Sequence, residues 1–242
     1  MRLPRLITML LAGGAALLAA AILLSTFPAG ATERVAYTSM DGWRYVSNSP
    51  PAPVGRVITL FIDRDFDEHE RGRIVSAMRQ WNYVLNGYVQ FRATLLPEDP
   101  TRQMLSQIKH SGGWVVARVD SRHPIAHEGE GRQALAVTTG NRGGFVYVIS
   151  DRVGQRDLGG VVMHEFGHVL GAGHDGSGLM APVYTPAMGR CIDQEAVALV
   201  ARAQRLPMQR LNWCVGPAGN NGALPMAQGR PYYGQPMAAL PR

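Results

Sequence analysis

Apolar and polar residues alternate with two different periods along the middle of the chain. Short runs rich in β-branched and aromatic residues predict strands, because such side chains suit a pleated and half-buried surface. The five residues GNRGG join the last two runs, and this glycine-rich link predicts a β-hairpin. Strands are expected at residues 56–63, 88–95, 114–119, 134–139 and 145–150.

Spacings of three and four residues between apolar side chains predict helices elsewhere. Ile74, Met78, Trp81 and Leu85 form one such series, so a helix that begins after Asp67 should bury one face. The order of strands and helices predicts an α/β domain, with a mixed, twisted sheet of about five strands packed in layers against three main helices. Two further main helices are expected at residues 158–170 and 193–205, and a short helix at residues 100–109.

The two ends of the chain differ in composition from this middle part. Residues 1–31 carry Arg2 and Arg5, then an uncharged apolar stretch and a final AGA, which predicts a signal peptide or, without cleavage, an N-terminal membrane anchor. Either form places the rest of the chain outside the cytoplasm, as a secreted, periplasmic or anchored protein. Residues 32–55 are rich in turn formers and are expected to be irregular. The Gly- and Pro-rich tail, residues 216–242, is expected to be disordered.

Composition and charge exclude some partners. The chain of 242 residues is 46% hydrophobic and 17% charged, which is ordinary for a globular protein and suits one domain over residues 56–215. Its net charge of +6 comes mainly from arginines scattered along the sequence, without the basic run that nucleic-acid binding favours. We therefore expect no nucleic-acid partner, no membrane contact beyond the N-terminal segment, and a monomer.

The two cysteines, Cys191 and Cys214, both lie in the C-terminal part of the chain. In an exported protein an even count of cysteines favours a disulfide, and closing this loop would stabilise the fold by roughly 3 kcal/mol. Two buried, unpaired thiols are the alternative that the sequence leaves open.

Residues 164–175 read HEFGHVLGAGHD, which places metal-binding side chains at regular spacings. On a helix, His164 and His168 project from the same face one turn apart and can reach one ion. Glu165 is one step around the helix, where it can touch a water molecule on the metal. Gly171 permits a turn with positive φ, which would bring His174 up as a third ligand. Three neutral nitrogens with a fourth position open are typical of a catalytic zinc site.

The sequence GLMAPVY follows after a few residues, and its methionine, Met180, is expected to form an apolar floor beneath the metal. The pattern H-E-x-x-H-x-x-G-x-x-H followed by a methionine turn resembles the signature of the metzincin metallopeptidases. Within that clan, residues 162–184 are similar to the matrixins, the matrix metalloproteinases and their bacterial relatives. The resemblance implies a zincin-like fold for the catalytic domain, residues 56–215, and the activity of a zinc endopeptidase.

By this resemblance the three histidines hold one catalytic Zn²⁺. Glu165 is then the general base that activates a zinc-bound water against the peptide bond. Pro182, Val183 and Tyr184 are expected to line the substrate pocket. The strand at 134–139 is the candidate edge that pairs with an extended polypeptide substrate.

The chain also departs from the matrixin pattern. Asp175 follows the last histidine where matrixins have Ser or Thr, and no cysteine precedes the motif to keep the enzyme latent. Additional Ca²⁺ or structural Zn²⁺ sites are not placed, because His110, His123 and His127 are interpreted as surface loop residues. Two other functions stay open: a non-catalytic zinc-binding module of the cell envelope, and a zinc hydrolase of a non-peptide cell-wall substrate.

Overall fold

The structure is a computed structural model, and it describes residues 37–38, 43–46, 49–127, 133–186, 190–217 and 238–239. All of them belong to one compact unit, Val35–Arg242. The predicted signal peptide or anchor, residues 1–31, lies outside the described residues. Within the described part of the chain, no helix combines the length and the apolar character that crossing a bilayer requires.

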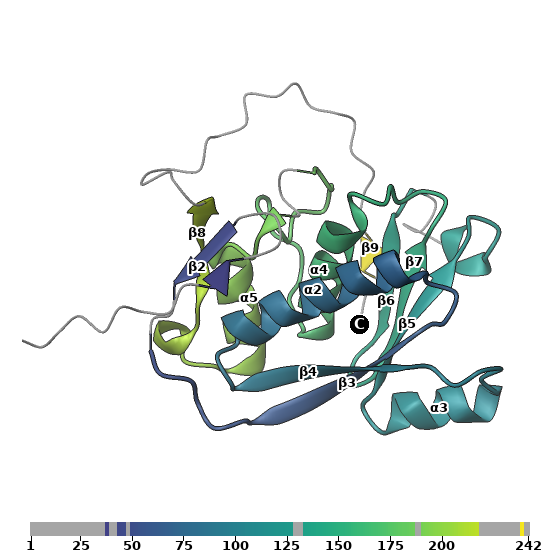
Figure 1. Cartoon of the computed structure of the whole chain (residues 1–242), viewed down its shortest axis with the longest axis horizontal. Coiled ribbons are helices and arrows are strands. Elements are labelled where there is room, and N and C mark those ends of the chain that lie inside the picture. The colour runs from purple at the N-terminus through teal and green to yellow at the C-terminus, as the bar shows by residue number, and fades with distance from the viewer. Residues whose placement is uncertain are drawn as a thin grey trace, which may run out of the picture. The chain divides into compact units, whose positions relative to one another are not determined.

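A mixed β-sheet forms the centre of this unit (Figure 1). The predicted hairpin is present. Its second strand, residues 144–149, runs parallel to the neighbouring strand at residues 114–119, and its first strand, residues 136–140, runs antiparallel to the second. The α/β class and the mixed sheet with the five predicted strands are confirmed, and a two-residue strand adds a sixth. In spatial order the strands are β4 (Val89–Leu95), β3 (Arg56–Ile62), β5 (Trp114–Val119), β7 (Gly144–Ile149), β6 (Ala136–Gly140) and β9 (Ala238–Ala239).

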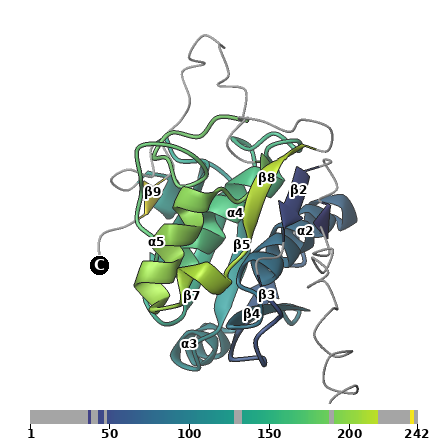
Figure 2. The same ribbon diagram turned by 90° about the vertical axis from the view of Figure 1, so that its left-hand side faces the viewer.

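Helices lie on both faces of the sheet, as the strand β5 shows. Trp114 and Val116 pack into the main core with α2 and α4, whereas Val115 faces the other way and packs with residues of α3. Figure 2 shows α5 beside α4, and Gln204 near the end of α5 donates a hydrogen bond of 2.5 Å to the carbonyl of Leu170. The helices are α2 (Glu68–Val84), α3 (Arg102–His110), α4 (Leu158–Val169) and α5 (Gln194–Gln204).

A polar contact from α2 fixes the helix that carries the histidine motif. The helix α2 begins after Asp67, as predicted, and Asp67 caps it in a reciprocal capping box with Glu70. From α2, the indole nitrogen of Trp81 donates to the carbonyl of Met163 in α4 over 2.8 Å. Because Trp81 is fully buried, this hydrogen bond holds α4 in one rotation against α2.

The sequence patterns do not predict a second, three-stranded sheet that the structure contains. Two of its strands lie inside residues 32–55, which were expected to be irregular, and the third runs to Pro217, inside the tail expected to be disordered. The structure corrects both expectations at these residues. Pairing between segments far apart in the sequence creates these strands, and local patterns do not report such pairing. The strands are β1 (Tyr37–Thr38), β2 (Trp43–Val46) and β8 (Trp213–Pro217).

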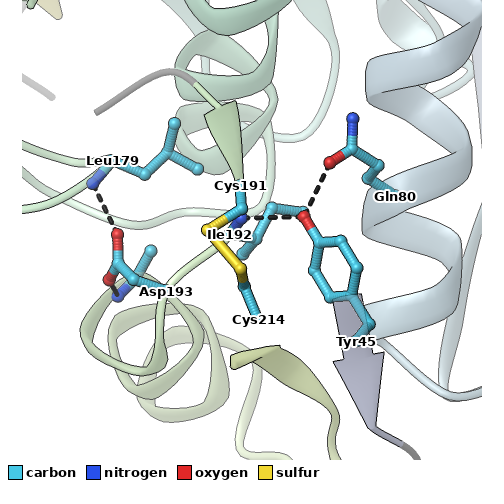
Figure 3. The surroundings of a disulfide bond; sticks show 8 residues. Tyr45, Gln80, Leu179, Cys191, Ile192, Asp193 and Cys214 are labelled. Carbon is cyan, nitrogen blue, oxygen red and sulfur yellow. Dashed lines mark hydrogen bonds between the residues drawn. A yellow bond between two sulfur atoms is a disulfide. The ribbon is translucent and has the colours of Figure 1, made fainter. Parts of the chain in front are cut away.

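The predicted disulfide between Cys191 and Cys214 is confirmed (Figure 3). Beside it, the hydroxyl of Tyr45 donates to Oε1 of Gln80 over 2.6 Å and accepts from the backbone N–H of Ile192 over 2.9 Å. These groups are buried, so each hydrogen bond prevents an unsatisfied polar atom. The phenol thereby connects β2, α2 and the chain that leads into α5.

Candidate metal centre

Three imidazoles converge at the C-terminal end of α4. His164 and His168 project one turn apart from the helix, and His174 comes from the chain that follows it. One nitrogen of each ring lies within 4.8 Å of the others, and the Nε2 atoms of His164 and His168 are 2.9 Å apart. Ring centroids are separated by 4.6–5.3 Å. The predicted convergence is therefore present, and the cluster could hold a metal ion.

A sharp turn after α4 brings the third histidine to the other two. Gly171 has a φ of +84°, a left-handed conformation that side chains rarely adopt. The N–H of Ala172 returns to the carbonyl of Gly167 over 3.0 Å, which closes the end of the helix. The chain then leaves the helix axis and places His174 opposite the helical pair, as the glycine predicts.

Backbone carbonyls select the tautomer of the two helical histidines. Nδ1 of His164 lies 2.6 Å from the carbonyl of Leu179, and Nδ1 of His168 lies 2.8 Å from that of Ala172. A carbonyl can only accept, so both Nδ1 atoms carry the proton and both Nε2 lone pairs face the cluster. Burial lowers the pKa of His164 well below its usual value and that of His168 to about 4. Both rings are thus neutral at physiological pH, the form that binds a metal.

Glu165, the residue after His164 in α4, is fully buried. Its Oε2 accepts a hydrogen bond of 2.5 Å from the hydroxyl of Thr138, whereas its Oε1 has no partner among the described residues. Burial raises the pKa of the carboxyl to about 8. A buried carboxylate oxygen without a protein partner is rare, and on the residue after His164 it would suit a water molecule held by a metal.

Met180 packs against α4 at Gly167, and its role as an apolar floor beneath the metal stays a prediction. Its side chain is 1% exposed, and a Cβ placed on Gly167 would lie only 2.4 Å from its sulfur. The methionine is in a tight turn, because the N–H of Asp175 donates to its carbonyl over 2.8 Å and Gly178 has a φ of +67°. Because Gly167 has no side chain, the thioether of Met180 can approach α4 between His164 and His168.

The predicted pocket residues form the chain beyond this turn. Val183 is 41% exposed, and Pro182 is also exposed. Tyr184 is buried, and its hydroxyl donates to Asp157 over 3.1 Å at the start of α4. Burial and the neighbouring Asp157 raise the pKa of this phenol. Their role in binding a substrate stays a prediction.

His110, His123 and His127 are not members of the histidine cluster. His110 ends α3 with Nδ1 2.6 Å from the carbonyl of Ser106, and His123 caps the short 3-10 turn Pro124–Ala126. His127 is exposed. Among the described residues, no second group of three potential ligands is present.

Two residues that support the site are absent from the sequence-based prediction. Thr138 lies in a predicted strand, but nothing in the local sequence pairs it with Glu165. Asp193 stands at the start of the helix predicted for residues 193–205, and it caps α5 by accepting from the N–H of Ala196 over 2.8 Å. Its second oxygen also accepts the N–H of Leu179 over 2.6 Å (Figure 3), which is visible only in the fold.

Comparison with known proteins adds no relative. Neither a protein-family model nor a curated protein matches the sequence. What the centre can do is therefore argued from its own atoms.

Proposed function

We propose that this chain is a zinc-dependent endopeptidase of the metzincin, matrixin-like type that acts outside the cytoplasm. His164, His168 and His174 are the proposed zinc ligands and Glu165 is the proposed general base. One observation carries the proposal: three imidazoles bring one nitrogen each within 4.8 Å of one another, and the residue after His164 carries a buried carboxylate oxygen that has no hydrogen-bond partner among the described residues. A purely structural metal site has no need of such a base.

The three nitrogen ligands favour zinc over calcium and magnesium. Three imidazole nitrogens suit Zn²⁺, whereas Ca²⁺ and Mg²⁺ prefer oxygen ligands. When bound, zinc supplies Lewis acidity, which acidifies water and polarises a carbonyl group. The protein contributes the fixed tautomers of His164 and His168, because the carbonyls of Leu179 and Ala172 hold their Nδ1 protons.

Glu165 moves the proton in this scheme. Its Oε1 accepts a proton from the water that attacks the peptide carbonyl, and it then returns that proton to the leaving amine nitrogen. The buried position excludes bulk solvent from the carboxylate. In the metal-free protein burial raises the pKa of this carboxyl to about 8, and a zinc ion held by the histidines would favour the ionised form that accepts a proton.

An extended polypeptide is the substrate that the surroundings favour. The strand β6 passes Glu165 at Thr138, and it lies next to the edge of the sheet. β9 pairs with β6 only through Ala238 and Ala239, so this edge already accepts an extended segment. A substrate that pairs with the same residues of β6 would take the place of β9. Val183, half exposed beyond the methionine turn, is the proposed contact for a substrate side chain.

The proposal is tested on the full exported chain by metal analysis and by cleavage of a peptide library. We expect one zinc ion per chain, cleavage within peptides, and loss of both on removal of the metal with 1,10-phenanthroline. The variant Glu165→Ala should keep its zinc and lose about 10²- to 10⁴-fold in kcat. Glu98→Ala is the matched control, because Glu98 is exposed and its carboxylate forms a surface ion pair with Arg64 at 3.6 Å.

Other outcomes would replace the proposal. Zinc without turnover of any peptide would favour a binding module of the cell envelope. Turnover of cell-wall material alone would favour a hydrolase of non-peptide substrates. A chain without metal affinity, or a Glu165→Ala variant as active as the parent, would refute the assigned chemistry.

A further inference from the structure

Thr138 contacts the proposed general base from a different element of the fold. It lies in β6, where residues two apart face the same side of the sheet. Ala136 and Thr138 face the core that contains α4, whereas Val137 belongs to a separate cluster on the other side. The register of the hairpin places Thr138 opposite Val146. At this position its hydroxyl reaches Oε2 of Glu165 over 2.5 Å.

The hydrogen bond has one direction when the carboxylate is ionised. A carboxylate oxygen can only accept, so the hydroxyl of Thr138 donates its single proton to Oε2. Thr138 is 6% exposed and Glu165 is 0% exposed, so water does not compete for this contact. Hydrogen bonds to charged groups are among the stronger ones in proteins, and this one fixes the rotation of the carboxylate.

We propose that Thr138 is a positioning residue that commits Oε2 of Glu165 and thereby makes Oε1 the oxygen that carries the proton. The inference rests on the proposed function. An O–H bond of the attacking water breaks and an Oε1–H bond forms, while the electron pair stays on the water oxygen that bonds to the carbonyl carbon. Oε1 then gives the same proton to the amine nitrogen as the C–N bond breaks. The Thr138 hydrogen bond to Oε2 persists through both transfers.

Threonine substitutions in two strands test this role. Thr138→Val keeps the shape and the strand preference but removes the donor, and Thr138→Ser keeps the donor. Thr59→Val makes the same chemical change in β3, a strand that contributes no residue to the candidate site, at a half-buried position. All variants are compared with the parent as full-length, zinc-loaded chains, with zinc content and thermal unfolding as controls.

We expect Thr138→Val to lower kcat by about 10- to 100-fold, the range for losing a hydrogen bond to a charged group. KM should change by less than about threefold, because the hydroxyl contacts the base and not the peptide. Thr138→Ser should restore kcat to within about threefold of the parent, and Thr59→Val should leave kcat unchanged. Equal activity of Thr138→Val and the parent, or failure of the serine to restore kcat, would overturn the proposal.

A second measurement does not depend on activity. In the metal-free protein under alkaline conditions, the carboxyl ¹³C chemical shift of Glu165 should move in Thr138→Val and stay unchanged in Thr138→Ser and Thr59→Val. A shift that is the same in all variants would show that the hydrogen bond is not made. If the parent proves inactive on every peptide, the proposed function falls, and with it the catalytic role of Thr138. The ¹³C comparison then decides only whether the contact exists.

Discussion

Asp193 joins the stability of the fold to the geometry of the metal centre. One carboxylate oxygen caps α5 through the N–H of Ala196 over 2.8 Å, and the other accepts the N–H of Leu179 over 2.6 Å. The carbonyl of Leu179 in turn accepts the Nδ1 proton of His164. Removing the carboxylate should therefore weaken both the protein and its affinity for zinc.

The expected loss of stability follows from the two N–H groups that Asp193 accepts from. Asp193→Ala removes a helix cap, which costs about 1 kcal/mol, and leaves the N–H of the buried Leu179 without a partner, which costs about 1–3 kcal/mol. We expect a total loss of about 2–4 kcal/mol in the free energy of unfolding. Asp193→Asn supplies one acceptor oxygen for the two N–H groups, so it should lose about 1–2 kcal/mol. Zinc affinity should fall by up to about tenfold in both variants, because the acceptor for His164 is no longer held.

Urea unfolding of the metal-free proteins and zinc competition with a chelator measure the two effects. Thr101→Ala is the matched control, because Thr101 caps α3 through the N–H of Met104 over 3.2 Å, in a helix that contributes no metal ligand. It should lose about 1 kcal/mol and keep the parental zinc affinity. The reasoning fails if Asp193→Ala is as stable as Thr101→Ala, or if its zinc affinity equals that of the parent.

Three further perturbations give distinct results. Replacing Cys191 and Cys214 together by serine should lower the free energy of unfolding by about 3 kcal/mol, since the disulfide closes a separation of 23 residues; an unchanged urea midpoint would contradict this. Gly167→Ala should cost about 1–3 kcal/mol on the same urea scale, because its Cβ would lie 2.4 Å from the sulfur of Met180. Burial raises the pKa of Glu165 from 4.5 to about 8 in the metal-free protein, so the unfolded chain loses its proton first and stability falls as the pH rises through this range. Glu165→Gln should remove that fall and be the more stable protein under alkaline conditions, whereas parallel pH profiles of the two proteins would refute it.

The histidine cluster depends largely on residues that are close together in the sequence, so the sequence alone predicts it. The spacing of His164 and His168 places both on one helical face, and Gly171 adopts the positive φ that the turn to His174 requires. The strands and helices of the main sheet follow from hydrophobic periods for the same reason. Each feature depends on neighbours close in sequence, so the pattern of residues contains the information.

The tertiary structure decided what holds these groups in place. The hydroxyl of Thr138 meets Glu165 across 27 residues of sequence, and the hydroxyl of Tyr45 meets the N–H of Ile192 across 147. Neither periodicity nor spacing encodes such a contact, because it depends on strand register and on how helices pack over the sheet. The sequence therefore predicted the histidine cluster. The orientation of the Glu165 carboxylate and the second sheet depend on the packing of segments far apart in the sequence.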